Sequence, residues 1–80
     1  MNNNEVRVRQ VMADVFSIST GAIDDETSPD TVEQWDSLRH LNLILALEQE
    51  FGISFTEEQT VELMNFPLIK VLLSEHGVTF

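Results

Sequence analysis

Side chains able to carry out catalytic chemistry are scarce in this sequence, and they are spread along the chain. There is no cysteine, and the two histidines, His40 and His76, fall in different predicted helices. The three glycines stand apart from one another, which excludes a glycine-rich phosphate-binding loop. A minimal hydrolase or transferase would need a nucleophile paired with a base, and we find no such pair. We therefore expect the chain not to be an enzyme.

The acidic run Asp24-Asp25-Glu26, followed by Asp30, is a candidate for metal binding. A calcium-binding EF-hand loop needs alternating oxygen ligands, a central glycine and a terminal glutamate. This run lacks all three features. The sequence therefore predicts no dedicated metal site, and at most incidental binding of a divalent cation.

One serine stands where a covalent modification is chemically favoured. Ser37 follows Asp36, whose carboxylate can accept the free amide hydrogens at the start of a helix. A hydroxyl in the first helical position projects outward at the positive end of the helix dipole, where the amide hydrogens favour a phosphate. Ser37 is thus suited to become a phosphodiester, although many Asp-Ser pairs begin a helix solely as a cap.

Hydrophobic periodicity predicts four helices that would position this serine. The first spans about residues 5–17, and the second and most clearly marked spans 37–51. A short third helix ends near Met64, and a fourth spans about residues 66–76. The predicted fold class is therefore all-α, a four-helix bundle that forms a single domain over residues 1–80.

The connections between these helices contain residues typical of turns and caps. Residues 18–36 lack helical periodicity and should form a long, irregular but ordered loop with a short helical turn around Ile23. Gly52 is suited to the left-handed position that ends a helix. Thr56, with Gln59 three positions later, predicts a capping box, and Asn65 should cap the fourth helix.

Apolar side chains at three- and four-residue steps should form the core. The predicted core residues are Val8, Val11, Met12, Val15 and Phe16 in the first helix and Leu43, Ile44, Leu47 and Phe51 in the second. Arg7 and Arg9 would take the solvent side of the first helix. Trp35 would pack against His40 or lie beside whatever is attached to Ser37.

The charge balance limits the classes of partner. Fourteen acidic residues against four basic ones give a net charge of −10, which should repel nucleic acid and anionic membranes. Basic patches on partner proteins should be attracted instead. The N-terminal residues do not resemble a signal peptide, and the longest apolar run, Leu43–Leu47, is too short to span a membrane. We expect a soluble, cytoplasmic and monomeric protein.

The segment around Ser37 resembles the acyl carrier protein family. It reads Trp35-Asp36-Ser37-Leu38-Arg39-His40-Leu41-Asn42-Leu43-Ile44-Leu45-Ala46-Leu47-Glu48-Gln49-Glu50-Phe51-Gly52-Ile53. In that family an Asp-Ser-Leu triplet opens the second helix, which closes on a Glu-x-Glu-Phe sequence. Chain length, acidity and the order of the helices extend the similarity to nearly the whole chain. The triplet alone is a weak signal, whereas the combination is specific.

The resemblance implies a 4′-phosphopantetheine arm on Ser37, transferred from coenzyme A by a phosphopantetheinyl transferase that uses magnesium. Asp36 matches the family's acid beside the serine, which helps to position that reaction. The thiol of the arm would carry acyl groups as thioesters to acyl-loading and acyl-processing enzymes with basic docking patches.

The resemblance also implies a docking surface and an acyl cavity. The docking residues would be Leu38, Leu41 and Leu45 with the acidic rim Glu48, Glu57, Glu58 and Glu62. The alternative is that these leucines are simply core. The cavity would be lined by Phe55, Thr60, Val61 and Leu63, which could equally be ordinary core residues.

Several residues depart from the pattern of the carriers that serve primary fatty acid synthesis. Gln34 and Trp35 precede the triplet where Leu-Gly or a similar pair is usual, and Arg39 and Asn42 replace acids that are common there. A specialised, stand-alone carrier for a polyketide, lipid-modification or aminoacyl pathway is therefore expected. The alternative function is an acidic helical adaptor that binds a basic partner and carries no prosthetic group.

Overall fold

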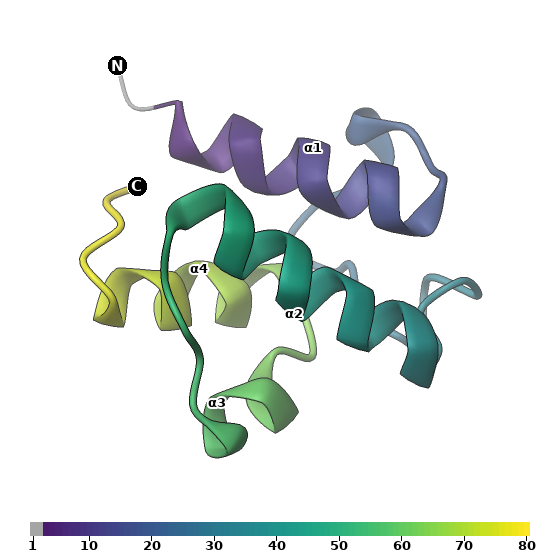
Figure 1. Ribbon diagram of the computed structural model, residues 1–80. Coiled ribbons are helices and arrows are strands. Elements are labelled where there is room, and N and C mark those ends of the chain that lie inside the picture. The colour runs from purple at the N-terminus through teal and green to yellow at the C-terminus, as the bar shows by residue number, and fades with distance from the viewer. Residues whose placement is uncertain (1–2) are drawn as a thin grey trace.

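The computed structural model describes residues 3–80, which form four α-helices and one short 3-10 helix (Figure 1). The elements are α1 (Asn4–Phe16), η1 (Thr20–Ala22), α2 (Ser37–Phe51), α3 (Glu57–Glu62) and α4 (Phe66–Glu75). There is no β-strand within this range. The predicted all-α class is therefore confirmed for the described residues, and the first two residues of the predicted domain lie outside them.

The predicted caps are present at the ends of the helices. The Asp36 carboxylate accepts a hydrogen bond of 2.8 Å from the Arg39 amide at the start of α2, and Gly52 ends this helix with φ of 65°. Thr56 and Gln59 form a complete capping box before α3. Asn65 caps α4 through a 2.8 Å bond from the Leu68 amide. The bounds of α2 agree with the prediction because both ends carry a strong local signal.

The other helices differ slightly from their predicted ranges. α1 ends at Phe16 because Ser17 takes a left-handed conformation, with φ of 57°. α3 ends at Glu62 rather than near residue 64, because Leu63 leaves the helical conformation. Its side chain is fully buried in the core, so packing takes precedence over continuation of the helix.

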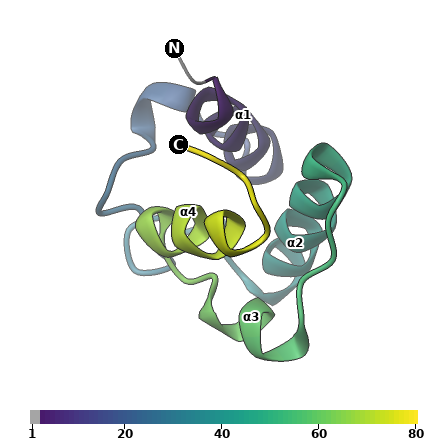
Figure 2. The ribbon, with the colours of Figure 1, turned by 90° about the vertical axis from the view of Figure 1, so that its left-hand side faces the viewer.

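The core lies between α1, α2 and α4, with α3 at one end of the gap between α2 and α4 (Figure 2). The largest fully buried side chains include Phe16, Phe66, Met12, Leu43 and Leu47. Of the predicted core residues, Val8, Met12, Phe16, Leu43, Ile44 and Leu47 are buried, and Val11, Val15 and Phe51 are partly buried against them. No helix within residues 3–80 has the length and apolar character needed to cross a membrane.

The long loop between α1 and α2 is attached to the core at several points. Ile23, Val32 and Trp35 are buried, and the turn expected around Ile23 is the 3-10 helix that directly precedes it. The Phe66 amide at the start of α4 donates a hydrogen bond of 3.1 Å to the Thr27 carbonyl. The loop thus reaches Ser37 along a defined path.

Arg7 and Arg9, which the sequence placed on the solvent side of α1, are half-buried, although the Arg7 side chain remains 40% exposed. Arg7 forms an ion pair of 2.9 Å with Glu50 of α2, and its guanidinium lies over the Phe51 ring. Arg9 donates to the Ile23 carbonyl at 2.6 Å and lies over the ring of Phe66. Both side chains therefore connect α1 to neighbouring segments, with their stems against apolar surface.

Candidate functional site around Ser37

Ser37 is the first residue of α2, and its side chain is exposed. Asp36 accepts hydrogen bonds from two amides of this first turn. Its carboxylate accepts from the Arg39 amide, and its carbonyl accepts from the His40 amide at 2.8 Å. The amides of Ser37 and Leu38 have no partner within the helix, as at any helix start. The Ser37 hydroxyl forms no hydrogen bond with any other residue in 3–80. Its oxygen is accessible and uncommitted.

A hollow of about 270 Å³ opens beside this hydroxyl. Its lining combines the loop, the first turn of α2 and the segment after α3: Pro29, Trp35, Asp36, Ser37, His40 and Met64. Pro29, Trp35 and Met64 supply apolar surface, whereas Asp36 and Ser37 supply polar groups. The hollow can therefore accept a group that is attached to Ser37 and is partly apolar.

His40 joins three parts of the site. Its Nδ1 accepts a hydrogen bond of 3.0 Å from the Trp35 indole, and its Nε2 lies 2.7 Å from the Thr60 carbonyl in α3. Because Nδ1 accepts and a carbonyl cannot donate, Nε2 must carry the proton, and the imidazole is the neutral Nε2–H tautomer. Both ring nitrogens are thus engaged, so His40 does not act as a base toward Ser37 in this arrangement.

Trp35 is placed by packing as well as by that hydrogen bond. Its ring lies 4.8 Å from the Phe16 ring and 6.2 Å from the His40 ring, which is nearly parallel to it. The predicted contact between Trp35 and His40 is therefore confirmed. The part played by Thr60 was not predicted, because hydrophobic periodicity relates residues within one element and not residues in separate elements.

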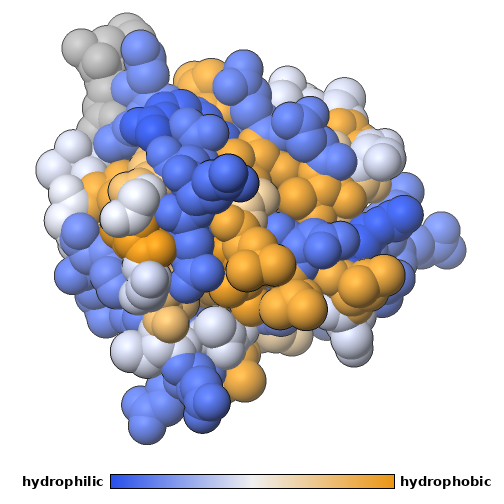
Figure 3. Space-filling view, in the orientation of Figure 1, coloured by the Kyte–Doolittle hydropathy of each residue, from blue (hydrophilic) through white to orange (hydrophobic). Residues whose placement is uncertain are grey.

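An apolar surface runs along α2 from the Ser37 end. Leu38, Leu41 and Leu45 are 68%, 52% and 55% exposed, so the alternative that they belong to the core is wrong. Val61 and Met64, in and after α3, are exposed as well. Figure 3 shows apolar side chains gathered over α2 on the face that it displays.

The predicted acidic rim falls into two groups. Glu57, Glu58 and Glu62 are exposed on α3. Glu48 is half-buried, and its carboxylate accepts a 2.8 Å hydrogen bond from the Phe55 amide. Glu48 therefore secures the connection between α2 and α3, and the role of all four residues in docking stays a prediction.

The residues predicted to line an acyl cavity differ in how deeply they are buried. Leu63 is fully buried, whereas Phe55 and Thr60 are half-buried. The Phe55 ring lies edge-on to the His76 ring at 5.4 Å. Val61 is 71% exposed, because it lies on the outer side of the short α3. For Val61 both expectations, cavity lining and core, are wrong.

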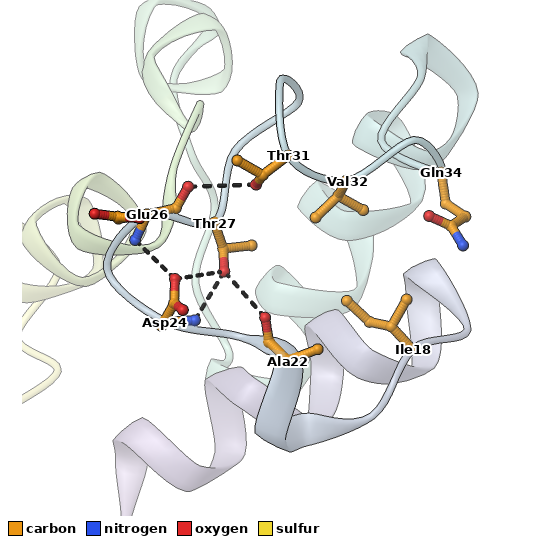
Figure 4. A pocket seen from close by; sticks show the side chains of 8 residues that line it. All are labelled: Ile18, Ala22, Asp24, Glu26, Thr27, Thr31, Val32 and Gln34. Carbon is orange, nitrogen blue, oxygen red and sulfur yellow. Dashed lines mark hydrogen bonds between the residues drawn. The ribbon is translucent and has the colours of Figure 1, made fainter.

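The acidic loop residues form structural contacts instead of a metal cluster. No group of three or more His, Cys, Asp or Glu side chains within residues 3–80 is arranged to hold a metal ion. Asp25 lies 3.9 Å from Lys70. The Asp24 amide donates to the Thr27 hydroxyl at 2.8 Å beside a second hollow of about 230 Å³ (Figure 4). These bonds satisfy the buried hydroxyl of Thr27 and fix the turn.

Comparison with known families gives no assignment: no protein-family model matches the chain. The site is therefore defined by its geometry. An unbonded serine hydroxyl at a capped helix start is flanked by a partly apolar hollow on one side and by an exposed leucine stripe along the same helix. Pro29 and Met64 belong to it although nothing in their sequence positions marked them.

Proposed function

We propose that the chain is a carrier protein that bears 4′-phosphopantetheine on Ser37 and presents acyl groups to partner enzymes, as the resemblance to acyl carrier proteins implies. The observation that carries the proposal is the Ser37 hydroxyl, which is exposed and unbonded at the first position of a capped 15-residue helix. A serine that served only as a cap would direct its oxygen to the helix amides. Here Asp36 performs that function, which leaves Ser37 available.

The residues around Ser37 fit such a group. The free amides of Ser37 and Leu38 and the helix dipole favour a phosphate at this end of α2. The hollow beside Ser37 is lined partly by the apolar Pro29, Trp35 and Met64, which suits the aliphatic part of the arm. When attached, the arm supplies a terminal thiol for thioester formation, a group that the chain itself lacks.

The chain's own residues would bind and position the partner. The exposed stripe Leu38, Leu41 and Leu45 begins beside Ser37, so an enzyme that reaches the serine also covers this apolar surface. The exposed acids on α3 would steer basic patches toward it. We infer a specialised pathway, such as polyketide synthesis or lipid modification, with a soluble, cytoplasmic and monomeric carrier.

The test is the intact mass after incubation with coenzyme A, magnesium and a broad-specificity phosphopantetheinyl transferase. The wild-type chain should gain the mass of one phosphopantetheine, and Ser37→Ala should gain nothing. Ser54→Ala, which removes another exposed serine hydroxyl, is the matched control and should be modified like the wild type. If several transferases leave the folded wild-type chain unmodified, the proposal fails.

A second function is favoured by the leucine stripe itself. An acidic adaptor without a prosthetic group would use the same exposed leucines to bind a basic partner. In that case Ser37→Ala would support the chain's cellular role fully, whereas Leu41→Glu or Leu45→Glu would abolish it. Loss of the role in Ser37→Ala would exclude the adaptor.

A further inference from the structure

Three of the four basic side chains are engaged in contacts within the protein. Arg7 pairs with Glu50, and Arg9 binds the Ile23 carbonyl. Lys70 lies 2.9 Å from Glu5 and 4.6 Å from the centre of the Phe66 ring. The guanidinium of the fourth, Arg39, forms no hydrogen bond, ion pair or ring contact with any residue in 3–80. Among the basic residues in 3–80, Arg39 is therefore the one whose charge makes no contact within the protein.

The position of Arg39 is also unfavourable for the helix. It is the third residue of α2, and its own amide points toward the Asp36 carboxylate. The positive end of the helix dipole lies here, where a cation is destabilising and an anion is preferred. A residue that opposes local stability without a compensating contact is expected where function requires it.

Arg39 lies within reach of any enzyme that acts on Ser37. A standard interface covers about 800 Å² on each partner, which corresponds to a disc with a radius of about 16 Å. Arg39 is half-buried and lies two residues from Ser37, a rise of about 3 Å along α2, but its side chain leaves the helix on another side. Because Ser37 is at the very start of the helix, an enzyme that covers this end of α2 to reach the Ser37 oxygen can also contact Arg39.

We propose that Arg39 is a selectivity contact, and that the enzymes which act on Ser37 present a carboxylate to it among the basic residues that face the surrounding acids. A uniformly basic docking face would meet repulsion at this point, whereas a face with one matching acid would not. This inference rests on the proposed carrier function, and it specifies the charge pattern of the transferase and of the later partners.

The first test measures kcat/KM for phosphopantetheine transfer by a broad-specificity transferase from another system, whose basic docking face has no acid to match Arg39. Arg39→Gln and then Arg39→Glu should be modified progressively faster than the wild type, by roughly two- to tenfold for the charge reversal. The difference should shrink at high salt because dissolved ions screen the interaction between the Arg39 charge and the docking face. Gln10→Glu, which lowers the net charge by one unit on the exposed side of α1, is matched to Arg39→Gln and should leave the rate unchanged.

The second test exchanges the charges. The basic residues of the transferase docking face are replaced by glutamate one at a time, and at least one replacement should raise kcat/KM for the wild-type chain and lower it for Arg39→Glu. Both Arg39 variants should also have a higher melting temperature, by roughly 1–8 °C, because the cation leaves the positive helix end.

The outcomes separate this inference from the proposed function. If the wild type is modified, but at the same rate as both Arg39 variants, the carrier function stands and the selectivity contact is refuted. A lower melting temperature in both variants would show that Arg39 stabilises the fold, which would also refute it. If no chain is modified by any transferase, both proposals fail.

Discussion

The two hydrogen bonds of the His40 ring, which link Trp35 to Thr60, lead to the most stringent prediction about stability. His40→Ala removes the acceptor for the buried Trp35 indole and the donor to the Thr60 carbonyl. Leaving a buried donor unpaired costs about 1–3 kcal/mol, and losing a further hydrogen bond costs about 0.5–1.5 kcal/mol. We therefore expect His40→Ala to lower the free energy of unfolding by about 2–4 kcal/mol, out of about 4–12 kcal/mol for a domain of this size.

Urea unfolding monitored by circular dichroism measures this loss directly. His76→Ala is the matched control, because His76 is also half-buried but has a single hydrogen bond, to Gln59, and an edge contact with Phe55. The His76→Ala variant should lose only about 1 kcal/mol of the free energy of unfolding.

A double-mutant cycle with Trp35→Phe tests the cause of the loss. Trp35→Phe removes the indole donor, so in the His40→Ala background it should be less harmful than in the wild type, with a coupling of about 1–2 kcal/mol. The reasoning is refuted if His40→Ala is no more destabilising than His76→Ala, or if the two substitutions are additive.

Two further predictions concern the ends of helices. Asp36→Ala should lower the free energy of unfolding by about 0.5–2 kcal/mol in urea melts, because it removes the carboxylate that caps α2; an unchanged midpoint would contradict this role. At the start of α1, the hydrogen bond and charge of Lys70 hold the pKa of Glu5 below its usual value. The resulting stabilisation is present above the unfolded-state pKa of Glu5 and is lost as the pH falls through the lower folded-state pKa. Because the pair is partly exposed, Glu5→Gln should cost less than about 1 kcal/mol at pH 7 and nothing at the acid end, as stability measured against pH would show.

How well the sequence predicts each feature depends on whether the interaction that determines it is local along the chain or joins distant residues. α2 is predicted correctly at both ends because Asp36 and Gly52 act on the backbone next to them. α3 is predicted too long because the burial of Leu63 depends on the shape of the assembled core. The local residue pattern contains no information about that shape.

The candidate site shows the same division. Ser37 and Asp36 follow from local helix chemistry, and the leucine stripe follows from periodicity, although periodicity alone could not decide whether the stripe is buried. The exposed side of α2 is fixed only when α1 and α4 occupy the opposite side. Contacts such as Arg9 with Ile23, or His40 with Thr60, join residues in different elements, so they require the three-dimensional structure.

The position of Trp35 gives the protein a built-in optical reporter. It is the only tryptophan in the chain, and it lines the hollow beside Ser37 while stacked near His40. Any group that enters this hollow changes the polarity around the indole and therefore its emission. If Ser37 carries an arm as proposed, its attachment and the later withdrawal of its cargo into a partner enzyme can be followed in real time by intrinsic fluorescence without labelling the protein.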